Sequence, residues 1–283
     1  VDTISGEEVF KLYDTFGFPI ELTREIAAES HLEINENDFN RLMAAQKKRA
    51  REARGNNGGW SEASKTLISG LPKTEFTGYT DFRSDAKIIA IIVDNELVDS
   101  VSEGNATVIL DRTPFYGEGG GQVGDTGTIY EGNRLMNVSD TKKSDGIYMH
   151  LCTVVNGLFS VGDSVKADIS DARRRAIARN HSAAHLLQSA LRKVLGDHVS
   201  QAGSYVRDRI CRFDFSHFAP MTEMELHEVE AIVNSFILAA RNIETIETDP
   251  ETARKMGVTA LFGEKYGKTV RMVKMADFST ELC

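Results

Sequence analysis

The sequence contains little cysteine and no long apolar run. Its three cysteines, Cys152, Cys211 and Cys283, lie far apart and are odd in number, which argues against a disulfide framework. We therefore expect a reducing, cytoplasmic setting. No apolar run approaches the ~18–20 residues of a membrane span, and no signal peptide is recognisable, so we expect no membrane partner.

Positive charge is scarce relative to negative charge. The formal net charge is −9, with 33 lysines and arginines against 42 aspartates and glutamates. A nucleic-acid-binding protein is more often basic overall. We expect no DNA partner. If RNA binds, the contact patch is small, or neighbouring parts of a longer protein supply most of the affinity.

A glycine-rich segment lacks the context of a nucleotide-binding motif. Residues Phe115 to Gln122 include Gly119, Gly120 and Gly121, and glycines permit positive φ angles and a close backbone approach to a ligand. The segment does not follow a strand and open a helix, and no Gly-Lys-Ser/Thr occurs, which argues against dinucleotide and phosphate-loop sites. A tight barrel corner and a ligand-contacting loop both fit the pattern.

Helical patterns occupy roughly the first 55 residues. Ser5 and Glu8 have capping-box spacing ahead of an apolar helix, and Gly17 suits its end. Further helices are expected over residues 21–29 and 38–54. The last of these ends in a run of cations, Lys47, Lys48, Arg49, Arg51 and Arg54. A solvated face is one interpretation of this run. Contact with an RNA backbone is the other, because phosphates need cations and no particular base.

From about residue 70, short β-rich runs alternate with turn formers. We expect strands over residues 87–93, 97–101, 107–110, 126–130, 135–138, 147–151 and 164–169. Closely spaced short strands without helices predict a small β-barrel.

After Ser170 the helical period returns. One long helix is expected from Asp171 to Leu195, closed by Gly196. Thr222 and Glu225 form a second capping box before another helix. The apolar stripe of that helix, which we expect to be buried, consists of Leu226, Val229, Ile232, Val233, Phe236 and Ile237.

These patterns predict an α+β fold in three parts. Residues 1–58 form a helical segment, and residues 59–170 form the β-barrel. Residues 171–283 form an α+β core. Strand patterns at 210–215 and 269–275 place a mostly antiparallel sheet in this core.

The pair His181 and His185 is the strongest local signal of chemistry. Residues at i and i+4 share a helix face and lie close enough to hold one metal ion. Two surface histidines bonded to solvent are the alternative, but the apolar stripe beside the pair indicates that at least one ring is protected. Zinc binds thiolate and imidazole together, although Cys283 alone carries no signal. A neutral amide such as Gln201 suits recognition of an ester or amine without added charge.

Several segments resemble alanyl-tRNA synthetases, in one order along the chain. They are Leu12–Pro19, Thr113–Gly127, His181–Leu187, Arg212–His217, Ala260–Gly267 and Glu281–Cys283. The first resembles the end of the family's tRNA-recognition domain, the second its glycine-rich barrel loop, and the third its first zinc motif. The last resembles the start of its second zinc motif. The resemblance covers essentially the whole chain, and the ordered set is specific where no single segment is.

The resemblance implies a zinc site and its surroundings. It makes His181, His185 and Cys283 ligands of Zn²⁺, and the family's fourth ligand, a histidine four residues later, lies beyond the end of this sequence. It makes Gln201 a catalytic residue beside the metal. It also implies that Gly119, Gly120, Gly121 and Ala184 contact the substrate and that Lys47, Lys48 and Arg51 contact tRNA. Ala184 stands where the family often has threonine, which removes a hydroxyl near the substrate.

The function that the resemblance implies is editing. The region would hydrolyse Ser-tRNA(Ala) and Gly-tRNA(Ala), with tRNA(Ala) as the partner. The parent enzyme would ligate alanine to tRNA(Ala) using ATP, through an aminoacylation domain that this chain does not include. We therefore expect no aminoacylation from this chain, and we expect it to continue covalently into the aminoacylation and C-terminal domains.

Three alternatives stay open. The chain is a non-catalytic tRNA-binding module, an unrelated zinc hydrolase of small esters, or a free-standing trans-editing protein. The helical segment over residues 1–55 resembles the interior of a synthetase and argues against the last of these.

Overall fold

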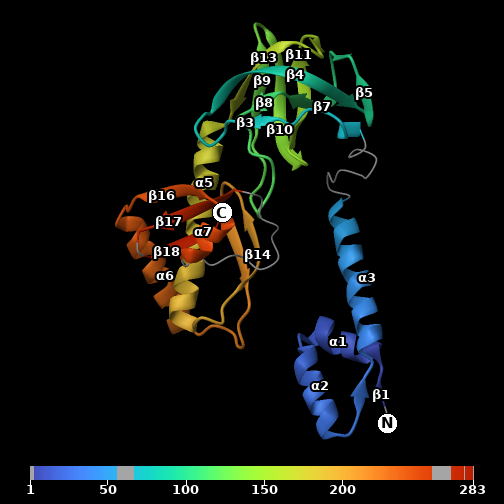
Figure 1. Ribbon diagram of the computed structural model, residues 1–283, viewed down its shortest axis with the longest axis vertical. Helices are drawn as coiled ribbons and strands as arrows, with labels where there is room; N and C mark the ends of the chain where they lie inside the picture. Colours follow the sequence, from blue (N-terminus) through green and yellow to red (C-terminus); the bar gives the residue numbers. More distant parts are fainter. Residues whose placement is uncertain (1–2, 56–66, 257–268, 277, 283) are drawn as a thin grey trace. The chain divides into compact units, whose positions relative to one another are not determined.

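The computed structural model describes residues 3–55, 67–256, 269–276 and 278–282. The chain divides into two compact units, Val1–Leu67 and Ile68–Cys283. Their α+β content agrees with the predicted class (Figure 1). Within the described residues, no helix is long and apolar enough to cross a membrane.

The first unit is helical, as predicted. It contains α1 (Gly6–Phe16), α2 (Ile20–Glu29), α3 (Glu36–Gly55) and a parallel pair of short strands, β1 (Thr3–Ile4) and β2 (Glu33–Ile34). The capping box that begins α1 is confirmed, because Ser5 Oγ accepts from the Glu8 N–H and the Glu8 carboxylate accepts from the Ser5 N–H. Gly17 ends α1 with a φ of 64°.

The second unit begins with the β-barrel. Its main strands are β4 (Arg83–Val93), β5 (Glu96–Val98), β7 (Asn105–Leu110), β9 (Gly127–Glu131), β10 (Arg134–Ser144), β11 (Ile147–Asn156) and β13 (Ser164–Ile169). Six of them follow the order β13-β9-β10-β11-β7-β4, and β13 pairs with β4 to close the barrel, as predicted. Two short pairs accompany it: parallel β3 (Glu75–Phe76) with β8 (Arg112–Thr113), and antiparallel β6 (Ser100–Val101) with β12 (Phe159–Ser160).

The barrel encloses an apolar core. Phe115, Phe159, Ile88, Ile129 and Met136 are fully buried in one apolar cluster. A hairpin turn at Asp94 and Asn95, with φ angles of 50° and 64°, joins β4 to β5. Two consecutive positive φ angles match the twist of the paired strands.

The rest of the second unit is the C-terminal core. It contains α5 (Asp171–Leu195), β14 (Gln201–Val206), β15 (Cys211–Phe215), α6 (Glu223–Leu238), β16 (Ile243–Thr248), α7 (Pro250–Lys255), β17 (Val270–Met275) and β18 (Ser279–Leu282). Strands β16, β17 and β18 form an antiparallel sheet, and β14 pairs antiparallel with β15. The predicted bounds of α5 are confirmed, and so is the capping box of α6.

One part of the predicted core is wrong. Leu226 and Ile237 of α6 are each 52% exposed, whereas Val229 is buried against α5. The apolar stripe of α6 is therefore wider than the surface that α5 and β17 offer it. Strand β16 was not predicted, because its isoleucines, Ile243 and Ile246, are three residues apart rather than two.

Candidate functional site

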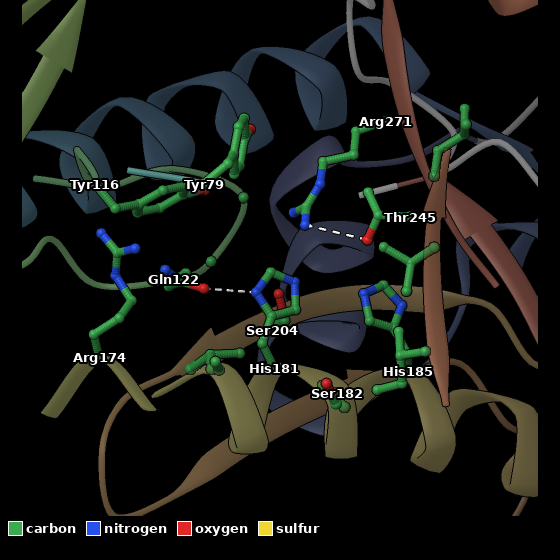
Figure 2. Close-up of a pocket in the computed structure, with 18 of the residues that line it drawn as sticks. Tyr79, Tyr116, Gln122, Arg174, His181, Ser182, His185, Ser204, Thr245 and Arg271 are labelled. Carbon is green, nitrogen blue, oxygen red and sulfur yellow. Dashed lines mark hydrogen bonds between the residues drawn. The ribbon is translucent and has the colours of Figure 1, made fainter. Parts of the chain in front are cut away.

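A cavity of about 740 Å³ lies in the second unit, between the barrel and the C-terminal core. Figure 2 shows the two histidines of α5 on one side of it and Arg271 of β17 opposite. Its polar lining residues are Tyr79, Tyr116, Gln122, Arg174, Arg175, His181, Ser182, His185, Gln188, Gln201, Ser204, Thr245 and Arg271. Among the described residues that line the cavity, three are arginines and none carries a carboxylate. Asp125 and Asp171, which lie outside the lining, pair with two of these arginines, Arg174 and Arg175.

Two arginines anchor helix α5 to the barrel: Arg173, which donates to the Gly124 carbonyl at 2.8 Å, and Arg174, whose side chain is 12% exposed. The Nε atom of Arg174 donates to Asp125 Oδ2 at 2.9 Å, and its terminal nitrogens donate to the carbonyls of Gly78 and Pro114 at 2.6 and 2.9 Å. Asp125 has 1% of its side chain exposed. This anchor fixes the start of the helix, and His181 and His185 follow about two and three turns further along it.

The glycine-rich loop is bonded to the edge of β14. The Val206 N–H donates to the Gly121 carbonyl at 2.8 Å, and the Val123 N–H donates to the Val206 carbonyl at 3.1 Å. Gly121 has a φ of 79°, and a Cβ there would collide with the Oγ and carbonyl oxygen of Ser204. Only glycine allows this approach. The loop then delivers the buried side chain of Gln122 to the cavity wall.

The histidine rings lie parallel, with centroids 5.2 Å apart and planes 10° apart. The Nδ1 atom of His181 lies 2.6 Å from Gln122 Oε1, and that of His185 lies 2.5 Å from Glu281 Oε2. Both oxygens can only accept, so each histidine donates from Nδ1. In a neutral ring of this tautomer, Nε2 carries the lone pair.

Glu281 is itself held in place. Its other carboxylate oxygen accepts from the hydroxyls of Ser279 at 2.9 Å and Ser189 at 3.3 Å. Metal-binding histidines nearly always donate their second ring nitrogen to a carboxylate or another acceptor, which fixes the ring and leaves Nε2 to the metal. The donor set of His181 and His185 therefore fits a zinc ion.

The third predicted ligand, Cys283, lies outside the described residues. Leu282, the residue before it, lines the cavity. Among the described residues, no group of three ligating side chains is assembled. The other two cysteines, Cys152 and Cys211, do not line the cavity, and burial raises the pKa of both thiols.

An aromatic and cationic wall faces the histidines. The Arg271 guanidinium lies 4.5 Å from the centroid of the Tyr79 ring, and its Nη2 donates to Thr245 Oγ1 at 3.4 Å. Tyr79 contacts Phe76 edge to face, with centroids 4.9 Å apart. Barrel residues thus support a side chain of the C-terminal sheet.

The cavity brings several predicted site residues together. Gln201, Ala184, Gly120 and Gly121 line it beside the histidines, and Gln201 Nε2 donates to Ser204 Oγ at 3.2 Å. Gly119 is not among the lining residues. The roles of these residues stay predictions.

The predicted tRNA contacts belong to the other unit. Lys47, Lys48 and Arg51 fall in α3, and their side chains lie outside the part that the structure describes. Their role also stays a prediction.

Sequence reasoning missed the partners of the histidines and the wall opposite them. These residues are Gln122, Glu281, Arg271, Tyr79 and Arg174. Gln122 and Glu281 belong to segments that carry the family resemblance, and that was the one signal available. Arg271 and Tyr79 stand in ordinary strand and loop patterns.

The chain matches the family model of class II tRNA synthetases (A) over residues 1–173 and belongs to this family. Within it, the chain is similar to alanine–tRNA ligases. It is 47% identical to those of Alkaliphilus oremlandii and Clostridioides difficile and 48% identical to that of Acetivibrio thermocellus, in each case over 99% of this chain. The chain spans about a third, 32%, of the length of these curated relatives.

Proposed function

We propose that this chain is the editing region of an alanine–tRNA ligase and hydrolyses tRNA(Ala) that carries serine or glycine. The observation that carries the proposal is the cavity itself, which joins the histidine pair to three arginines and has no carboxylate among its described lining residues. An aminoacyl ester on the 3′ end of an RNA is the kind of anionic substrate that such a cavity would accept.

The need for such a site follows from binding energetics. Glycine is smaller than alanine and cannot be excluded by size, and serine adds only a hydroxyl. One methylene or one hydroxyl gives roughly 1–3 kcal/mol of discrimination, which is too little for accurate translation. A second, hydrolytic site supplies the remaining selectivity.

The zinc ion belongs to the proposal. His181, His185 and Cys283 would hold it, and when bound it supplies Lewis-acid polarisation to an ester carbonyl or to water. Gln122 and Glu281 keep both imidazoles in the Nδ1–H tautomer. Gln201 offers a neutral amide in the same cavity for orienting the substrate.

The proposed partner is tRNA(Ala). Lys47, Lys48 and Arg51 would contribute phosphate contacts from the first unit, and the cavity would take the 3′ end. Contacts of this kind weaken as salt concentration rises.

The test is deacylation of seryl-tRNA(Ala) by the full-length protein. We expect Cys283→Ala to lower kcat/KM about a thousandfold, because loss of a metal ligand removes several kcal/mol of transition-state stabilisation. Cys211→Ala is the matched control, since this thiol does not line the cavity, and it should retain the wild-type rate.

Other outcomes separate the alternatives. Equal rates for the Cys283→Ala variant and the wild type would contradict the metal role. Binding of tRNA without deacylation would identify a non-catalytic module. Cleavage of small esters in the absence of RNA would identify an unrelated hydrolase.

A further inference from the structure

Arg271 is the one arginine of the cavity without a counter-ion among the described residues. Arg174 pairs with Asp125, and Arg175 pairs with Asp171 at 2.6 Å. Glu247 lies directly opposite Arg271 in the β16–β17 register, but its carboxylate forms no ion pair with the guanidinium. A cation held in a cavity without a carboxylate partner is suited to an anionic ligand.

The surroundings of Arg271 hold its guanidinium plane and leave its edge available for hydrogen bonds. The plane packs on Tyr79, and Thr245 accepts one N–H. A guanidinium can stack on an aromatic face while its fork of N–H donors binds phosphate oxygens. In Figure 2 the group points into the cavity from the side opposite the histidines.

We propose that Arg271, stacked on Tyr79, binds the 5′-phosphate of the terminal nucleotide of the RNA substrate. This inference rests on the proposed editing function. The ester is carried by the ribose of the terminal adenosine, so its own 5′-phosphate lies within one nucleotide of the reacting carbonyl. A cavity of about 740 Å³ is within the range of ~300–1,000 Å³ that encloses ligands of nucleotide size.

Binding of two small probes tests the subsite directly. We expect the wild-type protein to bind adenosine 5′-monophosphate about 10- to 100-fold more tightly than adenosine, which corresponds to a hydrogen-bonded ion pair. Arg271→Gln should reduce this ratio to about one. Lys274→Gln is the matched control, because it removes one positive charge from the same strand outside the cavity, and it should preserve the ratio.

Two further variants distinguish loss of the phosphate contact from misfolding of Arg271→Gln. Arg271→Lys keeps the charge but loses the planar fork, so an intermediate ratio is expected. Thr245→Val removes the hydroxyl that accepts from the guanidinium and should weaken the monophosphate more than adenosine. Equal affinities of the wild type for the two probes would overturn the proposal.

Hydrolysis separates this subsite from the editing function. We expect Arg271→Gln to lower kcat/KM for the seryl ester of adenosine 5′-monophosphate about 10- to 100-fold and to leave that of seryl-adenosine unchanged. Hydrolysis of both esters with equal loss in the variant would overturn the phosphate subsite and leave the editing function intact. Phosphate-dependent binding without hydrolysis of either ester would support the phosphate subsite and overturn the editing function.

Discussion

The two histidines of the cavity differ from a chance pair in what holds their rings. Helical spacing places His181 and His185 on one face, and that much followed from the sequence. Their partners, Gln122 and Glu281, lie 59 and 96 residues away along the chain. Only tertiary structure brings such segments together, so no spacing rule could have found them.

Glu281→Gln tests whether this contact orients His185 for metal binding. The amide keeps the shape and an acceptor but loses the charge, and changes to such outer partners typically cost 10- to 100-fold in metal affinity. We expect zinc affinity, measured by competition with a chelator, to fall within that range. The ¹⁵N shifts of the His185 ring in the zinc-free protein should show less of the Nδ1–H tautomer.

Glu244→Gln is the control for this prediction. Glu244 is an exposed carboxylate on β16 of the same sheet, so its removal changes the net charge equally without contacting a histidine. Unchanged zinc affinity and an unchanged tautomer in Glu281→Gln would assign Glu281 a structural role alone.

At the scale of single elements, α5 connects the parts of the second unit. Its first turns bond to the barrel through Arg174, its middle lines the cavity, and its last turns pack on α6 through Ala190 and Leu191. The sequence predicted its bounds because both ends carry local signals. The sequence did not predict that the helix would contact both the barrel and the C-terminal core, because those contacts join residues far apart in the chain.

Arg174→Met is expected to destabilise the fold by about 3–5 kcal/mol. It leaves Asp125 as a buried charge without its partner. Arg175→Met, one position along, breaks an exposed i,i+4 pair with Asp171 and a cation–π contact with the Phe82 ring at 5.0 Å. Each is worth at most about 1 kcal/mol at an exposed site. Urea unfolding of the two variants measures the difference.

A second substitution separates the charge effect from lost packing. In the Arg174→Met background, Asp125→Asn removes the uncompensated charge and should recover part of the lost stability. Similar losses for Arg174→Met and Arg175→Met would contradict the anchoring role of Arg174.

Local sequence patterns predicted the main strands of the barrel but not its short strands or its register. The seven predicted runs correspond to barrel strands, because alternation and turn residues are local signals. The predicted run over 97–101 covers both β5 and β6, which the structure separates at Asp99. The two-residue strands β3, β8 and β12 were missed, since each exists only through its partner. Closure of the barrel was inferred from strand spacing, whereas the register between β13 and β4 came only from the structure.

For the molecule as a whole, the net charge and the expected pH dependence of stability arise from different residues. The net charge of −9 is spread over the chain, while the cavity concentrates arginines. The buried His150 of the barrel stands apart from both. Its Nδ1–H donates to the Val108 carbonyl at 2.8 Å, and its Nε2 accepts from the Thr113 hydroxyl at 2.7 Å. Thr113 in turn accepts from the Phe115 N–H at the start of the glycine-rich loop.

Burial lowers the pKa of His150 from 6.5 to about 4, against a smaller opposing contribution from the Val108 hydrogen bond. Because the folded-state pKa lies below the unfolded-state value, the unfolded chain binds more protons between these two pH values. The associated stability is fully present above about pH 6.5 and is lost as the pH falls towards 4. The shift corresponds to roughly 3 kcal/mol at most.

His150→Asn tests this contribution. Asparagine can still donate to the Val108 carbonyl but does not titrate in this range, so its free energy of unfolding should depend less steeply on pH between about 6.5 and 4. Urea unfolding at several pH values gives both slopes, and NMR titration of the wild-type His150 ring should give a midpoint near 4. The comparison uses slopes, so a constant stability loss in the variant does not affect it. Equal slopes would show that acid sensitivity arises elsewhere, and His150 would then only link β11 to the start of the loop.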